Sequence, residues 1–267
     1  MSRALALLLV LAAPALHAQG RAPSYGPAQF RCVRFEERSG SDVTTETGTR
    51  RAAARAGRVG ELVLAGIPRD DGVTLVSWYD RLAVWRVAAD DSLAPDTDGV
   101  LGGRFRGTLS ADGRYVAVQR PFVPNAVREL SDVASALDDL LPPLPARALA
   151  VGEAFRLADT LAIQRLADSA GLQRYRVERE TAGRVAPPAG DTLTPPFDRA
   201  VRDNGTFAWH PEHGVLRYER RLEIEVLVPP GGAVKRAVRS EVAQRTALVR
   251  LREDAGACAA LTPADFE

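Results

Sequence analysis

The most regular pattern of the chain is Leu216-Arg217-Tyr218-Glu219-Arg220-Arg221-Leu222-Glu223-Ile224-Glu225-Val226-Leu227-Val228. Apolar residues occupy alternate positions, and charged residues fill most of the positions between them. Because successive side chains of a β-strand point to opposite faces, the pattern predicts a strand with one packed face and one wet face. Arg220 interrupts the apolar side and predicts either a bulge or a charge that points inward.

Strand-like sequence continues on both sides of this stretch. The Pro229-Pro230-Gly231-Gly232 segment predicts a turn, after which residues 234–251 return as a long strand. Residues 181–199 contain two Pro-Pro pairs and are expected to form a loop. Further strands are predicted where β-branched and aromatic residues concentrate, namely at residues 30–35, 61–65, 73–79, 82–87, 104–109, 114–118, 155–164 and 173–178.

In one segment the apolar residues have a different spacing. From Asn125, apolar residues recur at steps of three and four, which predicts a helix near residues 126–141 with one apolar face. Asn125 is a suitable N-cap, and the Pro142-Pro143 pair ends the helix. The helix divides the strand-rich sequence into two halves.

A short echo links these halves. Gly107-Thr108-Leu109 precedes a turn and then Arg114-Tyr115, and Gly205-Thr206-Phe207 precedes a turn and then Arg217-Tyr218. Two hairpins with the same opening suggest an internal duplication, although hairpins share turn chemistry in any case.

These patterns predict a mostly β (α+β) protein with a curved antiparallel sheet or incomplete barrel, which the echo suggests is duplicated. We expect one helix near residues 126–141 to pack on that sheet. The expected organisation is a signal peptide (1–18), a flexible leader (19–29) and a single β-rich domain (30–267) whose two halves (30–124 and 146–252) are joined by the helix at 125–141.

The first residues predict export. Arg3 is followed by an uncharged apolar run and then by small residues that end at Ala18, which is the order of a signal peptide. The run is too short for a stable membrane span. We therefore expect a secreted or periplasmic protein with peripheral or no membrane contact.

Charge and cysteine content narrow the function. The chain has 35 basic and 34 acidic residues, a net charge of +1 that is unsuited to general nucleic-acid binding. Its two cysteines, Cys32 and Cys258, are expected to form a disulfide in an oxidising compartment. Because neither cysteine lies at the predicted cleavage site, we expect no lipid anchor there.

Aromatic residues supply the candidate ligand-binding site. Trp78, Tyr79 and Trp85 concentrate in one predicted hairpin, and Tyr115 is nearby in sequence. These rings could line a concavity for a lipid or a glycan, although aromatic residues are also the usual occupants of a sheet core.

Catalytic groups are sparse. The segment containing His210, Glu212 and His213 could bind zinc, but its spacing is not that of a helical zinc motif and Pro211 places it in a turn. Paired aspartates such as Asp70-Asp71 are ordinary turn residues. The sequence has no Gly-x-Ser-x-Gly motif and no phosphate-binding loop. We expect no enzyme activity, no cofactor and no metal.

The predicted architecture resembles the periplasmic lipoprotein-carrier fold, an incomplete barrel with helices across its mouth. The segment from Leu140 to Phe155, in which a Leu-Pro pair leads to Val-Gly-Glu and an aromatic residue, also resembles a segment that recurs in uncharacterised secreted bacterial proteins. The first resemblance implies a lipid or lipoprotein ligand. Neither resemblance identifies a catalytic residue.

Three functions follow, in order of preference. The first is a non-enzymatic exported protein that binds an apolar or amphiphilic ligand in the concave face of the sheet. The second is a cell-envelope interaction or assembly module that uses a sheet edge or the 181–199 loop. The third, least favoured, is a metal-dependent hydrolase around His210, Glu212 and His213.

Overall fold

The computed structural model describes residues 22–89, 91–158, 160–187, 191 and 193–267. The predicted signal peptide lies outside these residues. The protein is mostly β, with 59% of the described residues in strands. In chain order the elements are η1 (Pro27–Phe30), β1 (Val33–Thr47), β2 (Arg50–Arg69), β3 (Gly72–Ala88), β4 (Asp91–Leu93), β5 (Phe105–Ser110), β6 (Tyr115–Gln119), α1 (Asn125–Arg128), β7 (Ala154–Ala158), β8 (Leu161–Ser169), β9 (Leu172–Val185), β10 (Phe197–His210), β11 (Gly214–Val228), β12 (Val238–Glu253), η2 (Ala255–Cys258) and η3 (Pro263–Phe266).

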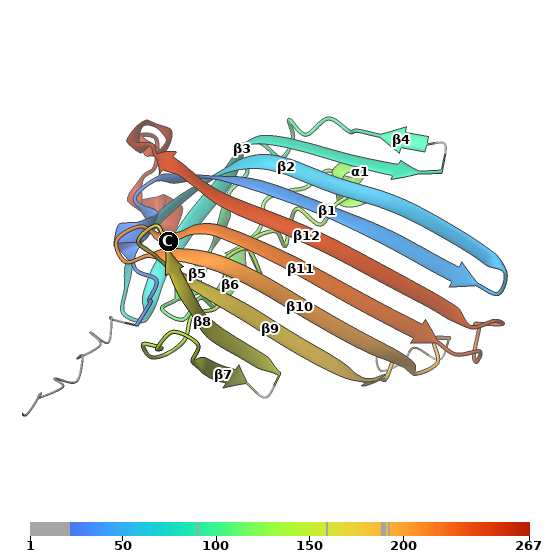
Figure 1. Ribbon diagram of the computed structural model, residues 1–267. Coiled ribbons are helices and arrows are strands. Elements are labelled where there is room, and N and C mark those ends of the chain that lie inside the picture. The colour runs from blue at the N-terminus through green and yellow to red at the C-terminus, as the bar shows by residue number, and fades with distance from the viewer. Residues whose placement is uncertain (1–21, 90, 159, 188–190, 192) are drawn as a thin grey trace, which may run out of the picture.

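All of these strands belong to one curved antiparallel sheet that stays open instead of closing into a barrel (Figure 1). The strand order is β6-β5-β3-β2-β1-β12-β11-β10-β9-β8-β7, and β4 pairs with β3. The first strand, β1, lies in the middle of the sheet, and the chain reaches one edge of the sheet at β6. It then crosses to the opposite edge at β7 and returns strand by strand to β12, which lies beside β1. Residues 120–153, which make this crossing, are called the strap below.

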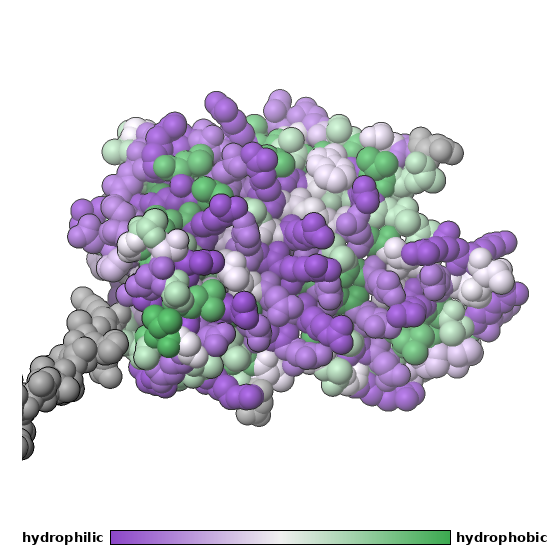
Figure 2. All heavy atoms as spheres, in the orientation of Figure 1, coloured by the Kyte–Doolittle hydropathy of each residue, from purple (hydrophilic) through white to green (hydrophobic). Residues whose placement is uncertain are grey.

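The strap covers one face of the sheet, called the inner face. Its buried apolar residues join the main core together with inner-face residues of both halves of the sheet. The opposite, outer face is seen in Figure 2 and is largely hydrophilic. The strap residues in this core are Val123, Val127, Leu130, Val133, Ala136, Leu137, Leu140, Leu144 and Leu149.

The helix predicted near 126–141 is wrong in its extent, because only Asn125–Arg128 is helical. Its apolar spacing correctly marked the residues that pack on the sheet. Arginine side chains from outside the predicted helix bind carbonyls of this segment. Arg58, Arg120 and Arg220 donate to the carbonyls of residues 132, 134 and 139, at 3.4, 2.9 and 3.5 Å. Pro124, not Asn125, is the N-cap.

Residues 22–29 contribute to the core, in contrast to the flexible leader expected at 19–29. Tyr25 is buried and packs edge-on against Trp209, with ring centroids 5.3 Å apart. The Tyr25 hydroxyl donates to the carbonyl of Pro142 in the strap at 3.0 Å. The segment is held because its aromatic side chain fills a gap between the sheet and the strap.

Two boundaries differ from the sequence prediction. Residues 73–79 and 82–87 form the single strand β3 instead of a hairpin, and Asp80 is an extra residue that shifts the register between Glu61 and Leu62 of β2. The expected 181–199 loop is shorter, since β9 continues to Val185 and β10 begins at Phe197. Pro187, Pro195 and Pro196 lie just outside these strands, where the missing amide hydrogens cost no ladder bond.

The sequence echo corresponds to one local contact in two hairpins. The ring of Tyr115 covers Gly107 of the neighbouring strand, and the ring of Tyr218 covers Gly205. A Cβ atom on Gly205 would lie 2.7 Å from the Tyr218 ring, so only glycine fits. A glycine covered by a cross-strand aromatic ring lets a sheet bend without leaving a gap. Shared local packing therefore accounts for the echo, while duplication of the halves stays a prediction.

Among the described residues, no helix combines the length and the apolar composition needed to cross a bilayer.

Candidate functional site

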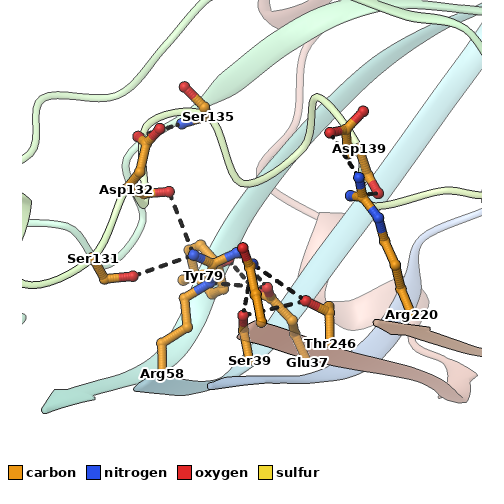
Figure 3. A network of polar contacts seen from close by, with 11 residues as sticks. Glu37, Ser39, Arg58, Tyr79, Ser131, Asp132, Ser135, Asp139, Arg220 and Thr246 are labelled. Atoms are coloured by element: carbon orange, nitrogen blue, oxygen red, sulfur yellow. Dashed lines mark hydrogen bonds and ion pairs between the residues drawn. The ribbon is translucent and has the colours of Figure 1, made fainter. Parts of the chain in front are cut away.

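A buried ion pair fastens the strap to the centre of the sheet (Figure 3). Nε and Nη2 of Arg58 lie 2.9 and 2.6 Å from Oε1 of Glu37, whose side chain is fully buried. The Tyr79 hydroxyl donates to the other carboxylate oxygen of Glu37. Nη1 of Arg58 reaches the strap, where it donates to Oγ of Ser131 at 3.2 Å and to the carbonyl of Asp132.

A second arginine makes a matching attachment from β11. Arg220 points inward, as one of the two sequence interpretations expected, and no register shift occurs there. Its Nε and Nη2 atoms each lie 2.8 Å from an oxygen of Asp203, which also accepts from Arg179 at 2.6 Å. Nη2 of Arg220 also lies 3.2 Å from Oδ2 of Asp139 in the strap (Figure 3).

The charges in this network stabilise one another. Burial opposes ionisation of Asp203, but hydrogen bonds and charges from Arg220 and Arg179 outweigh burial and hold its pKa below the usual value. Burial likewise opposes the charge on Arg58, yet the carboxylate of Glu37 keeps the pKa of Arg58 above its ordinary value. These groups therefore stay ionised at neutral pH and serve to hold the strap.

Two hollows remain between the strap and the sheet. One, of about 350 Å³, has a polar lining that includes Glu37, Ser131, Asp132 and Gln244. The other, of about 630 Å³, lies toward the β7 edge, and its lining includes five apolar residues. The hollows share Asp138, Asp139 and Arg220, so they meet at the second strap attachment. The five apolar lining residues are Leu141, Pro143, Leu157, Leu161 and Val177, and the rings of Tyr115 and Tyr218 also line the hollow.

Further along the long strands, the inner face carries an apolar row that no core element covers. Val43, Val242, Ile224 and Val201 are consecutive partners across β1, β12, β11 and β10. Leu222 and Val226 flank Ile224 on the same face of β11. All six side chains are partly exposed, and none belongs to the buried apolar clusters. We call these six residues the inner row; their strands run on beyond the strap (Figure 1).

The four aromatic residues proposed from the sequence do not form one site. They lie on β3 and β6, and their side chains divide between the two faces of the sheet. Tyr79 and Tyr115 are on the inner face, where Tyr79 is buried in the core and Tyr115 lines the larger hollow. Trp78 and Trp85 are on the outer face, where Trp78 is buried under the C-terminal residues and Trp85 is partly exposed.

Burial raises the pKa of Tyr115 to about 12, so its phenol is neutral in the hollow at physiological pH.

The predicted disulfide is confirmed. Cys32 and Cys258 are bonded, with Cα atoms 5.9 Å apart. The bond fixes η2 over a small outer-face cluster that contains Val63, Val76 and Trp78. A disulfide indicates an oxidising compartment, in agreement with export.

The segment containing His210, Glu212 and His213 forms the turn between β10 and β11, as predicted. None of these three residues lines the hollows described above.

No motif in the sequence pointed directly to Glu37, Arg58 and Asp203, which hold the strap. Alternation from Val33 and Phe35 does place Glu37 on the apolar face of its strand, and this is the same signal that singled out Arg220. The pairing partners could not be identified, because they depend on the register of strands far apart in sequence.

Comparison with known proteins adds little. No protein-family model matches the chain, and no curated protein has detectable sequence similarity. Among solved structures, lipovitellin, studied for its lipid–protein interactions, matches with a TM-score of 0.47 and 10% identity over 87% of this chain. The chain spans about a quarter (26%) of the lipovitellin chain.

Two further structures match more weakly. Neisserial surface protein A has a TM-score of 0.26 at 10% identity, covering 82% of this chain and 97% of its own. A DUF1329 family protein from Desulfovibrio piger has a TM-score of 0.16 at 14% identity, covering 87% of this chain and 89% of its own. The TM-scores of these three structures are all below 0.5, so none of them carries an argument about function.

Proposed function

We propose that this chain is an exported, non-enzymatic protein that binds an apolar or amphiphilic ligand along the inner row. The observation that carries the proposal is the continuous row of Val43, Val242, Ile224 and Val201 across four strands. Aliphatic side chains normally occupy a sheet face because that face packs against something. Here the row lies outside the buried core that the strap forms with the sheet, although Leu222 at its end also lines the smaller hollow.

The surroundings of the inner row suit a long, flexible ligand. Ser41, Thr45 and Ser240 lie beside the row on the same face, and their small side chains leave room above the strands. The hollow of about 630 Å³ under the strap is a separate space, because no residue of the inner row lines it. An acyl chain lying on the row would exclude water from it, and its polar end would face solvent at the open sheet.

The ionised groups near the strap are better suited to holding the strap than to catalysis. Glu37 and Asp203 each bind an arginine through two hydrogen bonds. A carboxylate held in this way is a poor general base, because taking up a proton would break the pair.

A substitution on β11 tests the proposal. Ile224→Asp puts a charge in the middle of the inner row and should weaken binding of a dansyl-labelled fatty acid at least about tenfold, because burying the charge is unfavourable and apolar contact is lost. Leu227→Asp is the matched control on the same strand, since Leu227 is 43% exposed on the outer face. Fluorescence titration of both variants gives the result. An equal loss of fatty-acid affinity in both variants, or no fatty-acid binding by the unaltered protein, would contradict the proposal.

A protein-assembly function is the second candidate, and the edge strand β6 favours it. Val116 and Val118 are 49% and 62% exposed, and Phe122 just beyond them is 78% exposed. Among the described strands β6 pairs only with β5, so its other edge is open. An unpaired apolar edge can accept a strand from another protein.

Photo-cross-linking distinguishes this second candidate. Benzoylphenylalanine at Val118, introduced in the producing cells, should give one discrete adduct with another protein if β6 recruits a strand. The same group at Val59 is the control, because Val59 is 43% exposed but lies on the interior strand β2. An absence of adducts at Val118, or the same adducts at Val59, would eliminate β6 as a docking edge.

A further inference from the structure

The turn between β10 and β11 brings together both histidines of the described chain. Ligand atoms of His210, Glu212 and His213 all lie within 4.8 Å of one another. The two imidazole rings are stacked with centroids 4.7 Å apart and 24° between their planes. Two imidazoles and a carboxylate are donors that Zn²⁺ and similar divalent cations prefer.

The position of this turn is fixed by its neighbours. Trp209 and Val215 flank it, and both are buried in the main core. Gly214 has a φ of +73°, which lets the chain reverse directly after His213. The Nδ1 atom of His210 accepts a hydrogen bond from the backbone amide of Glu212 at 3.2 Å, which restrains the ring. The donor atoms therefore lie on a rigid hairpin, as a metal site requires.

A fourth donor comes from a different strand. Oε1 of Glu253, at the end of β12, lies 3.9 Å from Nδ1 of His213. Arg250 holds this carboxylate at 3.0 Å and donates to the carbonyl of His213 at 2.9 Å. Glu212 and Glu253 carry two negative charges, and Arg250 carries one positive charge. The net charge of these three side chains is therefore negative, which favours the binding of a cation.

We propose that His210, Glu212, His213 and Glu253 form a zinc site that joins the β10–β11 turn to the end of β12. From the sequence alone, the three donors His210, Glu212 and His213 did not predict a metal site, because no further ligand could be identified. The fold adds Glu253, whose Oε1 lies 3.9 Å from Nδ1 of His213, as a fourth donor, and structural zinc sites are almost always four-coordinate. The proposed role is to fasten the end of the sheet near the disulfide, and it is independent of ligand binding on the inner row.

Titration with Zn²⁺ and with Co²⁺ tests the site on mature protein that carries no histidine tag. We expect one Zn²⁺ per chain with micromolar or tighter affinity, visible absorption bands of four-coordinate Co²⁺, and a rise in the thermal midpoint when Zn²⁺ is added. His213→Ala should weaken binding more than the roughly 10–100-fold caused by losing an outer-shell partner, and should remove the thermal shift.

The control is Glu219→Gln, an exposed carboxylate on β11 outside the cluster, which should bind Zn²⁺ as the unaltered protein does. Because His213 is exposed, the alanine variant should fold normally, and circular dichroism verifies this before titration. The proposal is overturned if the His210→Ala/His213→Ala variant binds Zn²⁺ as tightly as the unaltered protein. It is equally overturned if the unaltered protein binds no Zn²⁺ at micromolar concentrations.

Discussion

Replacing Arg58 with methionine should lower the free energy of unfolding by about 3–5 kcal/mol, because the fully buried carboxylate of Glu37 would lose its partner charge. The substitution also removes the hydrogen bonds to Ser131 and to the carbonyl of Asp132, so the strap should loosen. Urea denaturation measures the first effect. Hydrogen exchange of the strap amides measures the second.

Two further variants separate charge from packing. Glu37→Gln combined with Arg58→Met removes both charges and keeps an acceptor for the Tyr79 hydroxyl, so it should recover most of the lost stability. Arg38→Met breaks the exposed pair with Glu36 on the opposite face and should leave stability unchanged. A single Arg58→Met variant as stable as the unaltered protein would show that this ion pair does not hold the strap.

Removing the disulfide should have a comparable effect. The bond joins residues separated by 226 positions, and a cross-link that closes so long a loop strongly restricts the unfolded chain. We expect Cys32→Ala/Cys258→Ala to cost about 2–5 kcal/mol. The outer-face cluster around Trp78 should also open, since Cys258, Leu261 and Phe266 cover it.

Guanidinium denaturation of the double variant measures this cost. The unaltered protein in its reduced state serves as a second form that lacks the bond. Reduction and alkylation followed by mass spectrometry confirms that both thiols were bonded. An unfolding midpoint that does not change in either form would mean that β1–β12 pairing alone fixes this end of the sheet.

The sequence was informative wherever one residue pattern determines one face of one strand. Alternation from Leu216 to Val228 predicted β11 and the break at Arg220, and Arg220 proved to be an inward charge. It could not identify Asp203 or Asp139 as partners of Arg220, because these contacts depend on strand register and on the path of the strap.

Local patterns failed where distant residues determined the conformation. The apolar spacing after Asn125 correctly predicted burial but not a helix, and the segment is instead held through its backbone carbonyls by Arg58, Arg120 and Arg220. The extra residue at Asp80 changed which side chains of β3 share a face. It therefore places Trp85 on the outer face with Trp78, whereas the adjacent Trp78 and Tyr79 point to opposite faces by simple alternation. The inner row was missed because its four central members come from four strands.

Photo-cross-linking with a diazirine-bearing palmitic acid tests the central claim, that the inner row is a ligand-binding surface, most directly. We predict saturable labelling that unlabelled palmitic acid prevents, with adducts mapped by mass spectrometry to residues 41–45, 222–226 and 240–244, and loss of these adducts in Ile224→Asp. Adducts confined to the outer face, or labelling that neither saturates nor responds to competitor, would contradict the account.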